Sequence, residues 1–388
     1  MEFEKKIIDF VKKNYIIIGF IFITIVALLI RYFELGFKSN DYKIFLSKWF
    51  DQLKNNGGIK GIPKYSGDYN APYITLMALL TYIPINKLYL IKFLSIIFDF
   101  SLAISSSCLV RYLAPKNKKI FGLLTYMVIL FLPEVLFNGA LWGQCDSCYA
   151  TFVILALLFL LKEKHIHSFI FLGIAFAFKL QFIFVLPIFI VLYLTQESEK
   201  RISILHFFII PLVNFILCLP AIIFGKSIKE VLLIYFNQST SYKNSLVLNF
   251  PNIYNLIPGD PKIFNKVGIL FTLVICASML AYIIYKNVKW NNEKILTLTL
   301  WFMIIITYLL PGMHERYLFV GEILAVICYI VYRKNLNITL CVIINAIITY
   351  STYLFKVKII DYSYLSIIYL LIIIYFTKDT LNLISKKR

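Results

Sequence analysis

The sequence predicts an all-α, polytopic membrane protein built as a single helix bundle. Of its 388 residues, 60% are hydrophobic and only 15% are charged, whereas about a quarter of the residues in soluble domains are charged. The mean hydropathy is +0.81. Mostly apolar runs of roughly 18 residues or more recur along the chain, which is the length that crosses about 30 Å of hydrocarbon. Together these observations exclude an ordinary soluble domain.

The N-terminal segment predicts a retained first helix with a cytoplasmic N-terminus. It reads MEFEKKIIDFVKKNY and precedes a full-length apolar span, whereas a cleavable signal has a short apolar region and a small-residue cleavage site. The chain is rich in Ile, Phe, Tyr and Lys and has few Ala and Gly. This bias is typical of AT-rich genomes and favours a multi-pass protein of a bacterial plasma membrane.

The net charge of +19 does not predict a nucleic-acid partner. The Lys and Arg residues are scattered among the loops between apolar runs, where they set topology and contact anionic lipid headgroups. The seven cysteines form no disulfide framework. Cys145 and Cys148 form a lone CxxC pattern, which we interpret as two chance cysteines at the start of a helix.

Hydropathy predicts twelve crossings with both termini in the cytoplasm. The run 168–196 is too long for one helix and contains Lys179 and Gln181, so we divide it into two short helices that meet at the outer face near Lys179. We expect one domain over 1–377 and a basic cytoplasmic tail over 378–388. The predicted spans are 14–32, 88–112, 119–136, 148–162, 168–178, 182–196, 203–224, 268–286, 295–310, 317–333, 336–354 and 363–377.

Two long loops, 33–87 and 226–267, lie on the outer side in this topology. The first contains DYKIFLSKWFDQLKNN, which predicts an amphipathic helix lying along the membrane surface. The segment ITLMALLTYIPI follows and is too short to cross alone, so we expect it at the interface too. The apolar positions with helical spacing in the first helix are Ile44, Phe45, Trp49, Phe50 and Leu53.

Polar residues from distant parts of the chain share the outer side of this topology. Ionisable groups near hydrocarbon are costly, so they usually face a cavity or one another and indicate a functional site. We therefore predict that they form one site. The candidate residues are Asp41, Asp68, Tyr69, Gln144, Asp146, Lys179, Gln181, Asn249, Asn252, His314, Glu315 and Arg316.

The chemistry of this set favours transfer of a group from a lipid-linked phosphate. Carboxylates provide a general base, and His, Lys and Arg bind phosphate, with Arg able to form two parallel hydrogen bonds. The chain contains no Gly-rich phosphate loop and no soluble nucleotide-binding half. A sugar on a lipid phosphate already carries its leaving group, so neither feature is needed.

The order of five segments resembles the GT-C superfamily of integral-membrane glycosyltransferases, which use polyprenyl- or dolichyl-phosphate sugars. FKSNDYKIFLSKWFDQL is similar to the first outer loop of that family, and GDYNAPYITL is similar to a segment of its glucosyltransferases. ALWGQCDS, LNFPNIYNL and MHERYLF resemble segments of the bacterial and GPI-anchor mannosyltransferase-like branch. The resemblance covers about residues 25–320.

The resemblance implies an inverting hexosyltransferase that acts on the outer face of the membrane. Asp41 would be the catalytic base, and His314, Arg316 and Lys179 would bind the donor phosphate. The donor would be a polyprenyl-phosphate sugar such as an undecaprenyl-phosphate sugar, and the acceptor a cell-wall or surface polysaccharide, a glycolipid or a protein. No cofactor is expected. The first loop has no paired acidic motif, which favours a metal-independent site without excluding a divalent cation. The remaining expected sugar- or acceptor-binding residues are Asp68, Tyr69, Gln144, Asp146, Gln181, Asn249, Asn252 and Glu315.

Structural interpretations compete with several of these roles. Asp41 and Asp146 are also suited to cap helices, and Asp68 to make a turn. Lys179 is also suited to extend toward lipid headgroups. A less favoured interpretation of the segment His314–Arg316 is a solvated loop with one salt bridge.

Two other functions remain open at the level of the sequence. A transporter or flippase would place its charges near the membrane midplane between pseudo-symmetric halves, but the charges here gather at one face and no repeat is visible. A glycan polymerase or ligase that uses a lipid diphosphate would have several Arg-rich outer loops, and only one outer loop here pairs Arg with His.

Overall fold

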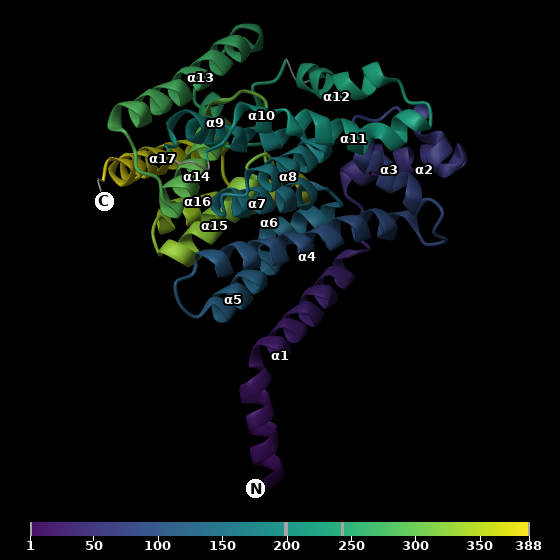
Figure 1. Ribbon diagram of the computed structural model, residues 1–388. Coiled ribbons are helices and arrows are strands. Elements are labelled where there is room, and N and C mark those ends of the chain that lie inside the picture. Colours follow the sequence, from purple (N-terminus) through teal and green to yellow (C-terminus); the bar gives the residue numbers. More distant parts are fainter. Residues whose placement is uncertain (1, 198–200, 242–243, 387–388) are drawn as a thin grey trace.

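The computed structural model describes residues 2–197, 201–241 and 244–386. Its helices pack into one bundle, from which the first helix projects at an angle (Figure 1). The chain is therefore all-α, apart from one two-residue strand pair.

Seven helices in the described part of the chain are long and apolar enough to cross a membrane. The presence of seven such helices shows that the protein spans a membrane. They are α1 (Glu2–Glu34), α4 (Lys87–Leu113), α10 (Ile204–Phe207) continued by α11 (Ile209–Ile223), α13 (Pro261–Lys286), α14 (Asn292–Leu309), α16 (Leu336–Phe355) and α17 (Tyr362–Ser385).

An eighth span is formed if a bent pair is counted as one crossing. α5 (Lys118–Phe131) meets α6 (Pro133–Leu136) and η3 (Phe137–Trp142) at an angle of 54°. Pro133 explains the bend, because proline has no backbone N–H and its ring excludes the preceding residue from the helical region.

The remaining helices are shorter than a full crossing. The apolar ones of 10–17 residues are α3 (Ala71–Leu80), α7 (Asp146–Leu161), α8 (His165–Phe178), η4 (Leu180–Val185) continued by α9 (Leu186–Thr195), and α15 (Phe319–Tyr332). The segments that connect these helices contain η1 (Tyr42–Leu46), α2 (Ser47–Asn55), η2 (Gly58–Lys64), α12 (Ile228–Ser241), β1 (Val247–Leu248), η5 (Ile253–Asn255) and β2 (Met313–His314).

All twelve predicted spans fall on helices. Only seven or eight of these helices are long and apolar enough to cross a membrane by themselves. The run 168–196 is broken at Lys179, whose backbone is extended. The helix α17 continues through most of the expected tail, and the last two residues of that tail, Lys387 and Arg388, lie outside the described part.

The surface helix after α1 differs from the prediction in the face that it buries. Leu46, Phe50 and Leu53 are buried, whereas Ile44 and Phe45 are about half exposed. The reason is the π-helical turn η1, which adds a residue to the turn and rotates the following positions around the helix axis. Ile44 and Phe45 therefore do not share a face with Phe50 and Leu53.

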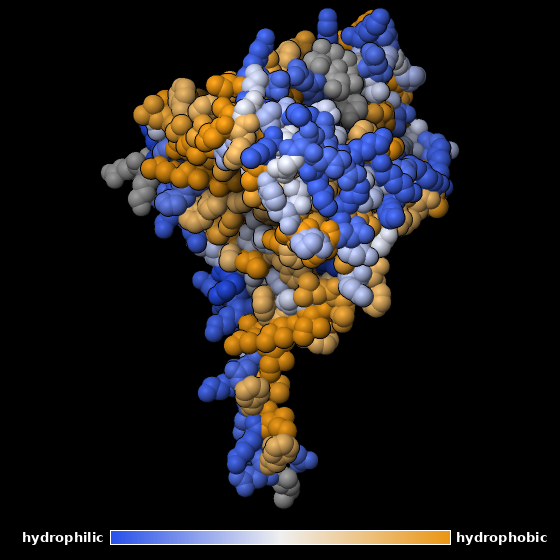
Figure 2. Space-filling view, turned by 90° about the vertical axis from the view of Figure 1, so that its right-hand side faces the viewer, coloured by the Kyte–Doolittle hydropathy of each residue, from blue (hydrophilic) through white to orange (hydrophobic). Residues whose placement is uncertain are grey.

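Polar and apolar residues occupy different parts of the surface. Figure 2 views the end of the bundle that carries α2 and α3, and polar residues gather over much of it while apolar residues cover the flank and the part of α1 nearest the bundle. This distribution matches a bundle whose sides face lipid and whose end faces water.

A buried ion pair joins α1 to the bundle. The Nε atom of Arg31 lies 3.1 Å from Oδ2 of Asp99 on α4, and both side chains are at most 1% exposed. Ser147 donates to the other oxygen of Asp99 at 2.6 Å, and Arg31 also donates to the carbonyl of Leu130 at 3.1 Å. A Cβ atom on Gly139 would lie 2.4 Å from Asp99 Oδ2, so glycine is needed there for this close approach.

We expect the substitution Arg31→Met to lower the free energy of unfolding by about 3–5 kcal/mol, because it leaves the carboxylate of Asp99 buried and unpaired. Thermal unfolding of the purified protein in detergent measures the effect. The double variant Arg31→Met/Asp99→Leu should recover most of the loss. Lys6→Met, in the exposed pair with Glu2, serves as the control, and an equal loss in that variant would contradict the account.

Candidate functional site

A group of polar side chains meets where several helices end. The N-terminus of α7, the break after α8 and the loop between α14 and α15 contribute residues, as does the last turn of α16. We call this group the Asp41 cluster. It consists of Asp41, Trp142, Gln144, Asp146, Lys179, Arg316 and Tyr353.

Asp41 is held by three donors from other parts of the chain. Its Oδ2 atom accepts from Nε1 of Trp142 at 2.9 Å and from Nε2 of Gln144 at 2.7 Å, and its Oδ1 atom accepts from the hydroxyl of Tyr353 at 2.5 Å. The side chain does not cap a helix. Ser39 does so instead, because its hydroxyl accepts from the backbone N–H of Tyr42.

A glycine turn brings Trp142 and Gln144 to the same carboxylate. Gly143 follows η3 with a φ of +82°, a conformation that glycine adopts without steric cost. The hydroxyl of Ser39 donates to the carbonyl of Trp142 at 2.9 Å, which fixes this turn against the start of the surface helix. Gln144 also accepts from the hydroxyl of Tyr69 at 2.9 Å, so its amide is oriented from both sides.

Aromatic rings from α16 enclose the indole. Trp142 stacks on Tyr353 with ring centroids 4.5 Å apart and meets the edge of Tyr350 at 5.5 Å. In addition, Cζ of Arg316 lies 5.7 Å from the centroid of Trp142. Such a position attracts a cation to the ring. Trp142 therefore contacts the carboxylate of Asp41 through its indole N–H and the guanidinium of Arg316 through its ring.

Asp146 is a fully buried carboxylate with two cationic partners. Lys179 is bonded directly to its Oδ1 atom. Nη1 of Arg316 lies 3.7 Å from its Oδ2 atom, which also accepts from Nδ2 of Asn138 at 2.8 Å. Burial of a lone carboxylate is costly, so these partners are required. Lys179 is occupied by this pair and does not extend to the lipid surface.

Arg316 retains an unsatisfied donor in this arrangement. Its side chain is 17% exposed, and its Nε atom is buried without a hydrogen-bond partner among the described residues. The nearest carboxylate oxygen for Nε, on Glu315, lies 4.0 Å away, which is too far for a hydrogen bond. An unmade hydrogen bond of this kind costs about 1–3 kcal/mol, and an anionic ligand would satisfy it.

A short strand pair fixes the segment that carries His314. Leu248 pairs with His314 in the parallel ladder of β1 and β2, and an Asn249 amide donates to Glu315 at 3.2 Å. Tyr362, at the start of α17, donates to Asn249 at 2.6 Å. Nδ1 of His314 lies 3.8 Å from Glu315, and the His314 ring is 18% exposed. This ladder and the bonds of Asn249 hold the histidine next to Arg316.

Asp68 lies in the loop before α3 and belongs to the same electrostatic environment. Burial raises its pKa above the ordinary value, while Arg316 and Lys179 lower the pKa and Asp41 raises it. The residue as a whole is exposed to water. The influence of all three charged groups places Asp68 near the Asp41 cluster.

Asn252 and Gln181 are two of the predicted site residues that form no hydrogen bond with the Asp41 cluster within the described part of the chain. Asn252 caps η5 and its amide lies 3.5 Å from the carbonyl of Leu310, which indicates a role in holding its loop. Gln181 lies two residues beyond Lys179, and its Oε1 atom is buried without a partner among the described residues.

Three aromatic members of this region were not among the predicted site residues. Trp142 lies within the segment ALWGQCDS, so it could have been selected together with the other site residues of that segment. Tyr350 and Tyr353 lie in an apolar run of the last helices, where a tyrosine is equally typical of the membrane interface.

No protein-family model and no curated protein sequence matches this chain.

We expect Lys179→Met to lower the free energy of unfolding by several kcal/mol, because removing one partner of a buried pair typically costs about 3–5 kcal/mol, and Arg316 compensates only in part. Thermal unfolding in detergent measures this loss. Lys119→Met, at an exposed position on α5, is the control. Equal stability of the two variants would show that the ion pair contributes nothing.

Proposed function

We propose that this chain is an inverting GT-C-type glycosyltransferase that transfers a sugar from a polyprenyl phosphate to a glycan, glycolipid or protein acceptor. The reaction would take place on the outer face of a bacterial plasma membrane. The observation that carries the proposal is that Asp41 and Arg316 both contact Trp142, at the end of a membrane-spanning bundle.

Asp41 has the geometry of a general base that is oriented in advance. A carboxylate has about four lone-pair sites, and Trp142, Gln144 and Tyr353 occupy three of them. The remaining site is on Oδ1, where it is available to the hydroxyl of an acceptor. A base held in this way reaches the reacting proton in a fixed direction.

Arg316 and His314 provide positive charge or hydrogen-bond donors for a leaving phosphate. The unsatisfied Nε atom of Arg316 provides a donor for a phosphate oxygen, and the partly exposed ring of His314 lies in the adjacent position. Donors aimed at a site of developing negative charge stabilise the transition state. Lys179 acts through Asp146, since it is already paired.

The proposed reaction is a single displacement. The acceptor oxygen attacks the anomeric carbon while its proton moves to Asp41. The bond between that carbon and the phosphate oxygen breaks, and its electron pair remains on the polyprenyl phosphate beside Arg316. The configuration at the anomeric carbon is inverted, and no further reactant is needed.

Helix positions support the twelve-crossing arrangement of this proposal. Each predicted span falls on a helix, and the shorter helices α7, α8 and α15 have largely buried sequences. Short helices inside a bundle are protected by their neighbours, because buried protein replaces lipid around their ends. The Asp41 cluster lies at helix ends, where a lipid-linked phosphate meets water.

Asp41→Asn should reduce sugar transfer by at least about a thousandfold, since it removes the base while conserving size. Purified protein is incubated with a panel of polyprenyl-phosphate sugars and acceptor extracts, and transfer and donor binding are measured separately. Donor binding should be retained. Asp51→Asn, on α2 and paired with Lys87, is the matched control. Transfer at the normal rate by Asp41→Asn would show that another group is the base.

Tyr353→Phe should lower kcat about tenfold with little change in KM, because a hydrogen bond to a charged group contributes about 1.5–3 kcal/mol. The hydroxyl orients Asp41 and does not contact the donor, so binding should be conserved. Steady-state kinetics of the purified variant distinguish the two parameters. Tyr364→Phe, on an exposed position of α17, should leave both unchanged. A rise in KM with constant kcat would contradict a positioning role.

A further inference from the structure

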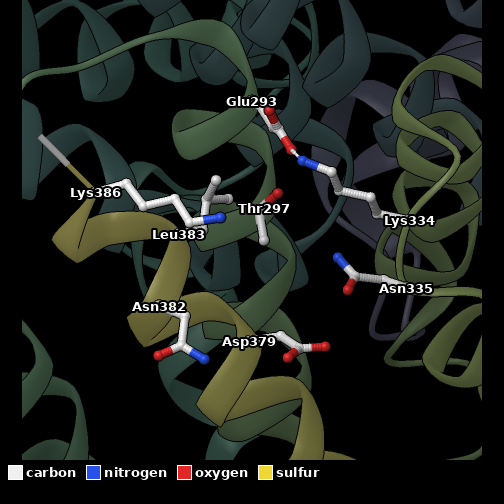
Figure 3. A pocket seen from close by; sticks show the side chains of 8 residues that line it. All are labelled: Glu293, Thr297, Lys334, Asn335, Asp379, Asn382, Leu383 and Lys386. Atoms are coloured by element: carbon white, nitrogen blue, oxygen red, sulfur yellow. Dashed lines mark hydrogen bonds and ion pairs between the residues drawn. The ribbon is translucent and has the colours of Figure 1, made fainter. Parts of the chain in front are cut away.

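A polar cavity lies at the opposite end of the helices that frame the Asp41 cluster. Its volume is about 340 Å³, and it lies between the N-terminus of α14, the turn from α15 to α16 and the C-terminal part of α17 (Figure 3). α14 and α16 have 18 and 20 residues. At 1.5 Å per residue they are about 27–30 Å long, which matches the hydrocarbon thickness. The cavity and the Asp41 cluster therefore lie at opposite ends of these helices, about one hydrocarbon thickness apart.

The walls of this cavity are fixed by charged side chains. Lys334 pairs with Glu293 at 2.5 Å, which joins the turn between α15 and α16 to the start of α14. Lys294 is buried and donates to the carbonyls of Ile384 at 3.3 Å and Lys386 at 3.1 Å. These bonds secure the end of α17, so the cavity is a feature of the packed helix ends.

Two opposite charges remain on the cavity wall after these pairs are formed. Asp379 and Lys386 form no side-chain ion pair with any residue that the structure describes. In Figure 3 the carboxylate of Asp379 points into the cavity, and the ammonium of Lys386 extends toward Thr297. Asn335 also lines the space. The cavity thus offers an anionic and a cationic group to one ligand, together with an amide.

The polar cavity adjoins a shallow apolar groove on the surface of the helices, whose enclosed volume is only about 10 Å³. Asn335 lines both, and the groove continues between α16 and α17. Its residues on α17 are Ile372, Tyr375 and Phe376, which precede Asp379 by one to two helical turns and lie toward the middle of the membrane. A polar cavity followed by an apolar groove matches the shape of an amphiphile.

We propose that this cavity and groove bind a membrane phospholipid whose headgroup contains a phosphate and a primary ammonium, as in phosphatidylethanolamine. The phosphate pairs with Lys386 and the ammonium with Asp379, while an acyl chain follows the groove. Because Glu293 pairs with Lys334 and Asp379 balances Lys386, the described residues that line the cavity carry no excess positive charge for an anionic lipid, and Asp379 repels one. A quaternary ammonium has no N–H to donate to Asp379 and binds less well.

The test uses full-length protein purified in detergent, stripped of lipid, and titrated with phosphatidylethanolamine, phosphatidylcholine or phosphatidylglycerol under native mass spectrometry. Phosphatidylethanolamine should be retained about threefold better than the other two, the size expected for a partly exposed charge pair. Asp379→Asn should abolish this preference. Asp9→Asn, on the exposed start of α1, should retain it. Equal retention of the three lipids by the wild type, or an unchanged preference in Asp379→Asn, would overturn the proposal.

A second pair of variants tests the groove. Ile372→Trp fills it and should reduce retention of every phospholipid at this site, whereas Ile374→Trp, on an exposed face of the same helix, should have no effect. If both variants retain lipid like the wild type, no acyl chain occupies the groove and the proposed site is wrong.

Discussion

The buried carboxylate of Asp146 is the constraint on which the rest of the site depends. A charge at this depth in an apolar bundle persists only with partners, and it obtains them from two distant segments, through Lys179 at a helix break and Arg316 in a later loop. The ion pair with Arg316 draws that loop against Trp142. Since Trp142 also donates to Asp41, one buried charge links the position of Asp41 to that of Arg316.

Hydropathy predicted the helices well because it depends on local composition alone. Each expected span lies on a helix, and the break near Lys179 followed from one lysine in an apolar run. The prediction of which face the first surface helix buries was wrong. Its π-helical turn arises from packing and has no signal in the local sequence. The pairing of β1 with β2 is equally absent from the pattern, since two residues are too few to show alternation.

The candidate site was predictable in its members but less so in their roles. Asp41, Gln144, Asp146 and Arg316 were chosen from the sequence, and the structure brings them together. Gln144 was expected to bind a sugar or acceptor, yet its amide lies between Asp41 and Tyr69, and only the fold reveals such partners. Tyr353 could not be selected, because a tyrosine in an apolar helix looks the same whether it faces lipid or a carboxylate.

The central claim is that Asp41 and Arg316 act on one lipid-linked donor. A cryo-EM structure of the protein in a lipid nanodisc with a non-hydrolysable polyprenyl-phosphonate sugar tests it most directly. The account predicts the phosphonate within hydrogen-bond distance of Arg316 Nε, with the anomeric carbon facing the free lone pair of Asp41. A phosphonate bound away from Trp142, or Asp41 and Arg316 separated by packed apolar side chains, would contradict it.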